Sequence, residues 1–472
     1  MSGFAVGNQL GYVAAAACFV IGLHLMNSPA TARRGNQVST AGMVIAVLDT
    51  LVLLAHDGTV TAVGWAVLIA GALIGSAVGL YVAQTVQMTA MPQLVSMFNA
   101  VGGGAAALVA IHDYIQAEAA VGVGVSTETT VTTLLDVIIG SVTFSGSIVA
   151  AGKLQGLIGG QPIIVRGGRL VNLGLAVVTL GSAGYMLASP SLPALLLVVL
   201  ATLAFGIMMV LPIGGADMPV VISLLNACTG IAVAMAGFVI GNWALIIAGA
   251  LVGAAGGILT ILMADAMNRS LANILVGGFG TGDAAAAALA GEGDAQVRSI
   301  AADDAAIQLA YASKVIIVPG YGLAAAQAQH AVAELAALLE ERGIEVSYAI
   351  HPVAGRMPGH MNVLLAEANV PYPQLKEMEE INPEFGRADV ALVIGANDVT
   401  NPAARRPGTA ISGMPILDVD QAKSIIVIKR SMGHGYAGID NELYTNPKTS
   451  MYFADAKTAL ADLTAAVKTL VA

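Results

Sequence analysis

Two short motifs in the last third of the chain contain residue types that bind phosphate. The sequence GYGLAA follows the apolar run VIIVP and sets Gly320, Gly322 and Ala325 in a GxGxxA spacing. In this spacing the first glycine makes a tight turn, the second lets the backbone approach a pyrophosphate, and the third small residue packs a helix on a sheet. The spacing alone is a weak signal, but between a strand and a helix it predicts a dinucleotide site.

The second motif is a basic pair with a hydroxyl, at Lys429, Arg430 and Ser431. Such side chains can bind a phosphate dianion through charge-assisted hydrogen bonds, although basic residues that end a strand are more often only solvated. The strand after the GxGxxA segment ends at His351, without the Asp or Glu that holds a ribose 2′-hydroxyl in an NAD site. Together the two features favour a nucleotide with a 2′-phosphate, which is NADP(H).

Apolar, β-branched runs predict the strands that position these motifs, at 313–319, 344–350, 389–396, 424–430 and 449–455. Helical periodicity runs from the glycine turn to about Arg342, and an amphipathic helix ends the chain. Open α/β sheets bind ligands at the carboxyl ends of their strands. Loops dense in Gly, Pro, Asn or Ser follow three of the strands, at 351–362, 395–402 and 431–440. The last loop, around Tyr436, is expected to close over a nucleotide as a lid.

The first part of the chain has the composition of a membrane protein. The whole sequence is 57% hydrophobic and 11% charged, and the first 270 residues hold only six of the 20 Lys and Arg. A bilayer core needs about 17–25 apolar residues per helix. On that criterion nine spans are predicted, near 8–26, 40–56, 62–82, 94–112, 131–150, 170–188, 192–211, 219–240 and 243–264.

The span at 40–56 is the weakest of the nine, because Asp49 and a short length also suit a buried or tilted helix. The fold class expected is a polytopic α-helical membrane bundle followed by a soluble α/β Rossmann-like dinucleotide-binding domain. The predicted divisions are a transmembrane domain at 1–268, a Gly/Ala-rich linker at 269–300 and an NADP(H)-binding domain at 301–472.

Charge predicts the orientation in the membrane. All six basic residues of the first 270 fall in loops that nine spans place on one side, so that side is expected to be cytoplasmic. The N-terminus would then be periplasmic in a bacterial inner membrane, and the C-terminal domain cytoplasmic. No basic segment precedes the first apolar run, so a cleaved signal peptide is not expected. The net charge of −10 argues against nucleic acid as a partner.

Polar residues deep in a membrane bundle are candidates for function. Asn99 and Asn226 are amides within predicted spans, and Asp217 lies just before the eighth span. The competing interpretations are structural: interhelical hydrogen bonds for the two amides, and a helix N-cap for Asp217. Hydroxyls in the fifth span are expected to bond to carbonyls of their own helix, at Ser141, Thr143 and Ser145. Cys18 and Cys228 are expected to act as small hydrophobes.

Long motifs in both parts resemble the beta subunit of proton-translocating NAD(P) transhydrogenase over nearly the whole chain. They are GYGLAAAQAQ, HPVAGRMPGHMNVLLAEA, VIGANDVTNPA, IIVIKRSM, GYAGIDN and, in the membrane part, GGADMPVVISLLNA. The resemblance implies an NADP(H) site in inverted orientation on the sheet. The implied binding residues are Gly320, Tyr321, Gly322, Ala325, Val353, Ala354, Gly355, Arg356, Met357, Pro358, Gly395, Asn397, Asp398, Lys429, Arg430, Ser431, Gly435, Tyr436, Ala437 and Gly438.

Within that set the resemblance puts Arg356 and Asp398 near the nicotinamide and pyrophosphate, and Tyr436 in the lid. It also assigns proton coupling to Asp217 and Asn226, with Asn99 at a position where some members carry a histidine. A titratable imidazole is therefore missing at that position. Asn226, Asp217, water, or a histidine elsewhere such as His24 or one from a partner would have to serve instead.

One Gly-rich motif predicts one nucleotide site, whereas hydride transfer between nucleotides needs two sites a few Å apart. The resemblance implies that an alpha subunit brings NAD(H), in a homodimer of alpha–beta units within the lipid bilayer. No metal, flavin or covalent nucleophile is expected, because the nicotinamides carry the chemistry. Two other interpretations remain open from the residues: a channel or transporter whose C-terminal domain only senses NADP(H), and a domain that serves only as a docking scaffold.

Overall fold

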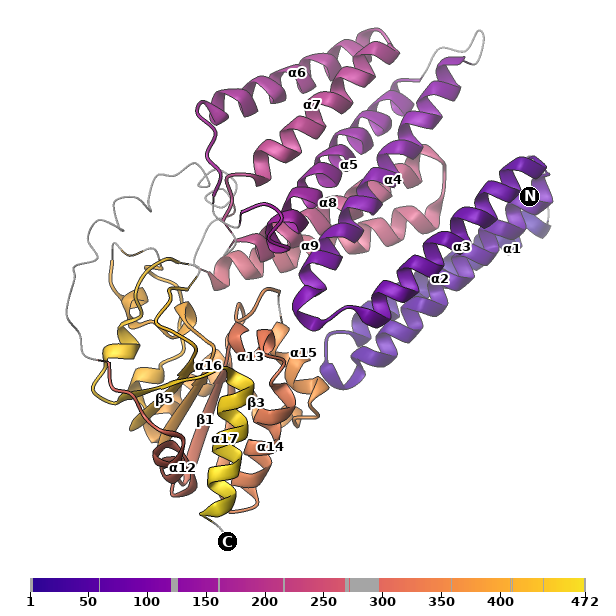
Figure 1. Ribbon diagram of the computed structural model, residues 1–472. Coiled ribbons are helices and arrows are strands. Elements are labelled where there is room, and N and C mark those ends of the chain that lie inside the picture. Colours follow the sequence, from indigo (N-terminus) through magenta and orange to yellow (C-terminus); the bar gives the residue numbers. More distant parts are fainter. Residues whose placement is uncertain are drawn as a thin grey trace. The chain divides into compact units, whose positions relative to one another are not determined.

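The structure is a computed structural model (Figure 1) and describes residues 3–58, 60–119, 126–159, 162–214, 217–267, 271, 297–357, 359–407, 409, 411–435 and 437–470. Its residues form two compact units. One contains residues 1–159, 165–212 and 221–260, and the other contains 160–164, 213–220 and 261–472. Most of the predicted linker at 269–300 lies outside the described residues, so the linker and the domain limits stay predictions.

Within the described part of the chain, nine helices are long and apolar enough to cross a membrane, as predicted. They are α1 (Gly3–Leu25), α2 (Pro29–Asp57), α3 (Ala62–Thr85), α4 (Met91–Ala119), α5 (Thr127–Leu154), α6 (Gly168–Ala188), α7 (Leu192–Val210), α8 (Met218–Val239) and α9 (Trp243–Ala266). The predicted limits were too short for α2 and α4. Apolar windows mark only the hydrocarbon section of a helix, and both helices continue beyond it.

Glycines let the membrane helices approach closely. A Cβ placed on Gly140 of α5 would lie 2.5 Å from the carbonyl oxygen of Gly103 on α4. On α8, a Cβ at Gly230 would lie 2.3 Å from the backbone nitrogen of Gly253 on α9. No side chain fits at such distances, so backbone packs directly on backbone. These glycines therefore bring α4 against α5 and α8 against α9.

Hydroxyls of α5 bond within the helix at two of the three predicted positions. Thr143 Oγ1 donates to the Ile139 carbonyl at 2.7 Å, and Ser145 Oγ donates to the Ser141 carbonyl at 3.1 Å. Both cysteines are unpaired and half-buried, as suits small apolar side chains.

The C-terminal sheet has six parallel strands in the order β3-β2-β1-β4-β5-β6. The strands are β1 (Lys314–Pro319), β2 (Glu345–Ile350), β3 (Leu375–Glu377), β4 (Val390–Ile394), β5 (Ser424–Lys429) and β6 (Thr449–Phe453). Five of them match predicted strands, and β3 was not predicted. The strand order reverses between β1 and β4, because β2 and β3 lie on one side of β1 and β4, β5 and β6 lie on the other. Open α/β sheets bind ligands at such a point. The predicted fold class is confirmed.

Elements on both faces cover the sheet (Figure 1). Helix α17 (Ala456–Thr469) packs against β5 and against α12 (Ala302–Ala310), α13 (Tyr321–Ala325) and α14 (Gln329–Glu340). Another core cluster joins buried residues of β1, β4 and β5 to Ile381, Phe385, Leu417 and Leu443. Because β1 and β4 are buried almost throughout, only their carboxyl ends and the following loops can meet a ligand.

The predicted helix from the glycine turn to Arg342 is broken. Helix α13 ends at Ala325 and α14 begins at Gln329. Between them Gln327 has φ +50°, a left-handed conformation, and the Ala328 N–H bonds to the Leu323 carbonyl at 3.1 Å. Periodicity of small and apolar residues continues across this turn, so the sequence pattern did not reveal the break.

We expect Gly140→Leu to separate α4 from α5, because its side chain has no space against Gly103. Overpacking of this kind costs about 1–3 kcal/mol or more. The midpoint of thermal unfolding in detergent should fall relative to the wild-type chain. Gly181→Leu on α6 is the matched control, since a Cβ there meets nothing within 4 Å. Equal midpoints for the two variants would contradict the backbone contact.

Candidate functional site

Backbone contacts among glycines join the carboxyl ends of β1 and β4. The Gly320 N–H bonds to the Ile394 carbonyl at 2.9 Å, and the Gly322 N–H bonds to the Gly395 carbonyl at 3.0 Å. A Cβ on Gly320 would lie 2.4 Å from Ala396, and one on Gly322 would lie 2.6 Å from Gly395 Cα. Gly395 itself has φ +66°. The GxGxxA motif therefore forms the predicted tight turn, with its second glycine against the next strand's loop.

The role expected for Ala325 is wrong. Ala325 is exposed, whereas Leu323 and Ala324 are buried. Helix α13 has only five residues before the turn at Gln327, and this short helix directs those two neighbours inward instead. Packing of the turn on the sheet thus depends on Leu323 and Ala324.

Arg356 joins the loop after β2 to the glycine turn. Its guanidinium carbon lies 4.2 Å from the centre of the Tyr321 ring, a cation–π distance. The Arg356 N–H donates to Nδ1 of His360 at 3.1 Å. Gly355 has φ +106°, and a Cβ there would lie 2.5 Å from the His360 ring. This loop presents a cation beside the predicted dinucleotide turn.

Two buried histidines hold the same loop. His351 Nδ1 accepts from the Val353 N–H at 3.2 Å, so its Nε2 is the atom that donates to the Pro415 carbonyl at 2.8 Å. Burial lowers the pKa of His351 to about 4. Burial, with the nearby positive charge of Arg356, also lowers the pKa of His360 to about 4. Both rings are therefore neutral at physiological pH, and His351 links the loop after β2 to the segment before β5.

Asn397 and Asp398 follow β4 and contact the predicted lid. Asp398 Oδ2 accepts from the Ala437 N–H at 3.1 Å. A Cβ on Gly435 would lie 2.3 Å from the other carboxylate oxygen. With its amide oxygen facing donors, Asn397 accepts from the Gly435 N–H at 2.7 Å and from Lys429 Nζ at 3.3 Å. The structure therefore brings together the predicted lid and the loop after β4.

The three residues of the basic motif have different surroundings. Lys429 Nζ donates to the Gly433 carbonyl and lies 4.7 Å from the centre of the Tyr444 ring. Burial lowers the pKa of Lys429, and the carboxylates of Asp398 and Asp440 act in the opposite direction. Arg430 and Ser431 are exposed. Lys429 thus holds the lid, while the other two present their polar groups to solvent.

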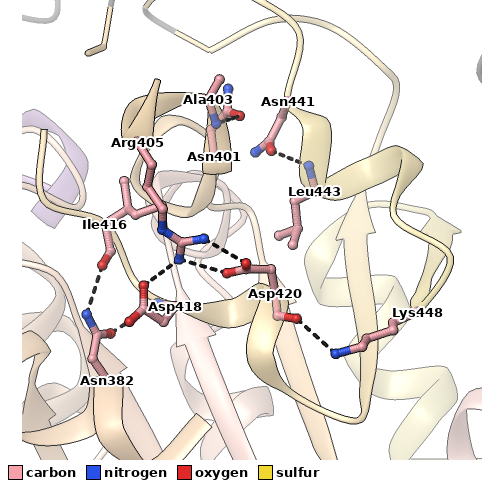
Figure 2. A network of polar contacts seen from close by, with 10 residues as sticks. All are labelled: Asn382, Asn401, Ala403, Arg405, Ile416, Asp418, Asp420, Asn441, Leu443 and Lys448. Atoms are coloured by element: carbon pink, nitrogen blue, oxygen red, sulfur yellow. Dashed lines mark hydrogen bonds and ion pairs between the residues drawn. The ribbon is translucent and has the colours of Figure 1, made fainter. Parts of the chain in front are cut away.

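An ion-pair network fixes the far end of the loop that carries Asn397 and Asp398 (Figure 2). Arg405 donates to Asp420 at 2.7 and 2.9 Å and to Asp418 at 2.5 Å. The Asp418 N–H donates to Asn382 Oδ1 at 3.1 Å, and Asn382 Nδ2 donates to the Ile416 carbonyl at 2.9 Å. The loop is thereby tied to elements next to β4 and β5, which limits its movement.

The remaining predicted binding residues lie around this centre. Val353, Ala354 and Met357 are in the loop that carries Arg356, and Gly438 bonds through its N–H to the Gly435 carbonyl at 3.2 Å. Pro358 and Tyr436 lie outside the described residues. Within the described part of the chain, no three His, Cys, Asp or Glu side chains gather as a metal ion would require.

Two of the three predicted coupling residues lie on α8 or against it. Asn99 is buried on α4, and its Nδ2 donates to the Ile222 carbonyl of α8 at 3.3 Å. Thr229 Oγ1 of α8 lies 3.3 Å from the Asn99 carbonyl. Asn226 is half-buried and stands one turn after Ile222. Asp217 directly precedes α8, and its N–H bonds to the Gly214 carbonyl at 3.2 Å.

Comparison with known proteins identifies the family. The model of the NAD(P) transhydrogenase beta subunit family matches residues 8–466. The chain belongs to this family. Two relatives from Rhodospirillum rubrum, both named NAD(P) transhydrogenase subunit beta, are 49% identical over 451 residues. These alignments cover 94% of this chain and 96% of each relative. The resemblance inferred from the motifs is confirmed, and the chain is an integral membrane protein.

Some residues that build the site were not predicted from the sequence. Asn441 donates to the Asn397 carbonyl at 3.0 Å, and the Tyr444 hydroxyl donates to the Ala396 carbonyl at 3.2 Å. Both follow the lid and belong to no phosphate-binding pattern. His351 and His360 belong to the motif HPVAGRMPGHMNVLLAEA, but nothing in their spacing indicates that they are buried. All four act by holding loops in place.

We expect the C-terminal segment 290–472, expressed alone, to lose stability as the pH falls from 6.5 toward 4. In that window the unfolded His351 binds a proton, while the buried ring, with its pKa lowered to about 4, does not. The loss from this residue is about 3 kcal/mol. His351→Gln should flatten the pH dependence of urea unfolding, whereas a change at exposed His330 should leave it unaltered. An unchanged slope in His351→Gln would contradict the assignment.

Proposed function

We propose that this chain is the NADP(H)-binding and proton-translocating subunit of a transhydrogenase. It accepts hydride from NADH held by an alpha subunit and couples that transfer to proton movement across the membrane. The observation that carries this proposal is the cluster at the carboxyl ends of β1, β4 and β5. There a glycine turn, Arg356, Asp398 and the basic motif lie on connected loops. Membership of the NAD(P) transhydrogenase beta subunit family supports it.

Preference for NADP(H) follows from charge at the end of β5. Arg430 and Ser431 are exposed there, and no acidic residue ends β2. The Arg430 guanidinium has no polar partner among the described residues, so a 2′-phosphate would not have to displace one. Lys429 would join them by exchanging its contact with Gly433 for the phosphate. The lid would then respond to the nucleotide through the same side chain.

Hydride passes directly between nicotinamides in this proposal. The side chains orient NADP(H) and exclude water, and none serves as acid, base or nucleophile. NAD(H) sits on the alpha subunit, which docks at the loop edge. Two alpha–beta units form the complex in the bacterial inner membrane, with the nucleotide domain in the cytoplasm and the N-terminus in the periplasm.

The proposal is tested by reconstituting the chain with the NAD-binding subunit in sealed vesicles. NADPH formation from NADH should proceed, and an uncoupler should change its rate when a proton gradient is imposed. If no hydride transfer took place while NADP(H) altered ion flux, a channel regulated by NADP(H) would replace the proposed function.

Arg430→Ala should weaken binding of NADPH to segment 290–472 by about tenfold or more, because each charge-assisted bond is worth roughly 1.5–3 kcal/mol. NADH binding should not change. Lys423→Ala, at the opposite end of β5, removes only a surface ion pair with Asp389 and is the control. Calorimetry that gave equal affinities for NADPH and NADH in the wild-type segment would remove the 2′-phosphate assignment.

Asp217→Asn and Asn226→Leu should abolish proton-linked turnover in vesicles. The physical reason is that polar groups are scarce in the bundle and that α8 begins directly after Asp217. A shift of α8 on protonation near Asn226 would reach Asp217 as a two-state coupling. The detached segment 290–472, mixed with the NAD-binding subunit, should still transfer hydride. Cys228→Ala on the same helix is the control. Normal, uncoupler-sensitive pumping in both variants would reduce the two residues to structural roles.

A further inference from the structure

Asp136 on α5 is a carboxylic acid buried inside the membrane unit. Its exposed fraction is 0%, and neither carboxyl oxygen has a hydrogen-bond partner among the described residues. Several other buried polar side chains of the bundle do have a partner. Asn99 donates to the Ile222 carbonyl, and Ser96 donates to the Ser147 carbonyl at 2.8 Å. Asp136 therefore has no evident structural bond to justify its burial.

The position of Asp136 is within the hydrocarbon depth. Helix α5 runs from Thr127 to Leu154, and at 1.5 Å per residue Asp136 lies about 14 Å from its start and about 27 Å from its end. A charged carboxylate there is costly, and acids at such depth commonly mark proton or ion pathways. The uncharged acid is the form that this environment stabilises. Entry of water or of a positive charge would favour release of the proton.

Asp136 belongs to a buried polar stripe along α5. Thr133, Asp136, Gly140, Thr143 and Ser147 follow at spacings of three and four residues, which places them on one helix face. All five are buried. The hydroxyls of Thr133 and Ser147, like the Asp136 carboxyl, lack partners among the described residues. The face thus has unused hydrogen-bonding capacity at Thr133, Asp136 and Ser147.

The stripe faces α4 and leads toward Asn99. A Cβ on Gly103 would lie 3.0 Å from both the Gly140 carbonyl and Thr143, and Ser96 bonds to Ser147. Asn99 lies between Ser96 and Gly103 on α4. Its level therefore falls near Thr143 and Ser147, on the order of 10–15 Å along α5 from Asp136. Asp136 and Asn99 therefore lie along the same contact between α4 and α5.

Among the described residues, no charged neighbour explains the burial of Asp136. Helices α4, α6 and α7 pack against α5, and α7 carries no titratable side chain. The titratable side chains of α6 are Arg169 and the exposed Tyr185. Helix α8 meets α5 at Gly146, and its titratable side chain is Cys228. The other titratable groups lie on α4 and α5: His112, Asp113, Tyr114, Glu118, Glu128 and Lys153. Of these six, Tyr114 and Lys153 are buried, and Lys153 donates instead to the Leu211 carbonyl.

We propose that Asp136 is a proton-binding residue of the translocation pathway, acting along the α5 stripe with Asn99. This rests on the proposed function. The step is a protonation: a hydronium ion in water reaching the bundle gives up one proton, so that one of its O–H bonds breaks, the carboxyl O–H bond forms and a water molecule is left. It later returns that proton to water on the opposite side, with no change in oxidation state. The acid thereby supplies the titratable group that Asn99 lacks.

The test uses the full chain with its NAD-binding partner in sealed vesicles. Asp136→Asn keeps the size and removes the titratable proton, so proton uptake coupled to NADPH formation should fall on the order of a hundredfold. Asp136→Glu should restore a large part of it. Thr179→Val is the matched control, because it removes a buried, unpartnered hydroxyl from α6 and should leave pumping unchanged. NADPH binding and the unfolding midpoint confirm that each variant is folded.

A second measurement reads the proton directly. Infrared difference spectra of the reconstituted chain, recorded between two pH values, should contain a C=O band of a protonated carboxyl that is missing in Asp136→Asn. If the wild-type complex pumps protons and Asp136→Asn pumps them equally well, the role of Asp136 is overturned and the proposed function stands. Absence of pumping in the wild-type complex overturns the proposed function, and this role with it. Pumping lost in Asp136→Asn, regained in Asp136→Glu and matched by the missing band supports the proposal.

Discussion

The soluble domain depends on one close contact, the packing of Gly322 against Gly395 where β1 and β4 diverge. A Cβ at either position would lie within 2.6 Å of the other residue's Cα. This contact sets where the loops after both strands begin. Arg356 reaches Tyr321 only because the turn after β1 is fixed, and Asp398 meets the lid only because the chain leaves Gly395 at φ +66°. Larger residues would displace the whole loop edge.

The membrane unit follows a different constraint, the satisfaction of polar groups without water. Most of its deep polar side chains donate to backbone carbonyls of the same or a neighbouring helix, as Thr143, Ser96 and Asn99 do. These bonds hold helices together without any titration. Asp136 departs from the rule, as do the hydroxyls of Thr133 and Ser147 on the same face of α5. This face includes Gly140, whose backbone meets Gly103 of α4. Of these three residues Asp136 is the one that can ionise, so its burial without a partner is more informative than the hydroxyls and amides that are satisfied.

Sequence patterns predicted the elements better than their surroundings. Hydropathy located all nine long apolar helices of the described residues, and β-branched runs located five strands there, because both signals are local. The three-residue β3 is too short to give a pattern, and the turn at Gln327 interrupts a run of small residues that reads as helix. Burial is a tertiary property, so the exposure of Ala325 and the burial of Asp136, His351 and His360 could not be read from spacing.

The energies involved set how large a structural change coupling requires. One elementary charge crossing 100 mV of membrane potential is worth about 2.3 kcal/mol, and one charge-assisted hydrogen bond is worth roughly 1.5–3 kcal/mol. A proton can therefore shift the free energy of NADP(H) binding by about as much as a single contact at the site. The limit is the difference between the proton's binding free energies in the two conformations of the protein. Lys429 makes contacts of that size with Gly433 and Asn397 of the lid and its neighbouring loop. Exchange of one such contact is enough for the proposed coupling, so large domain motion is not required by the energetics.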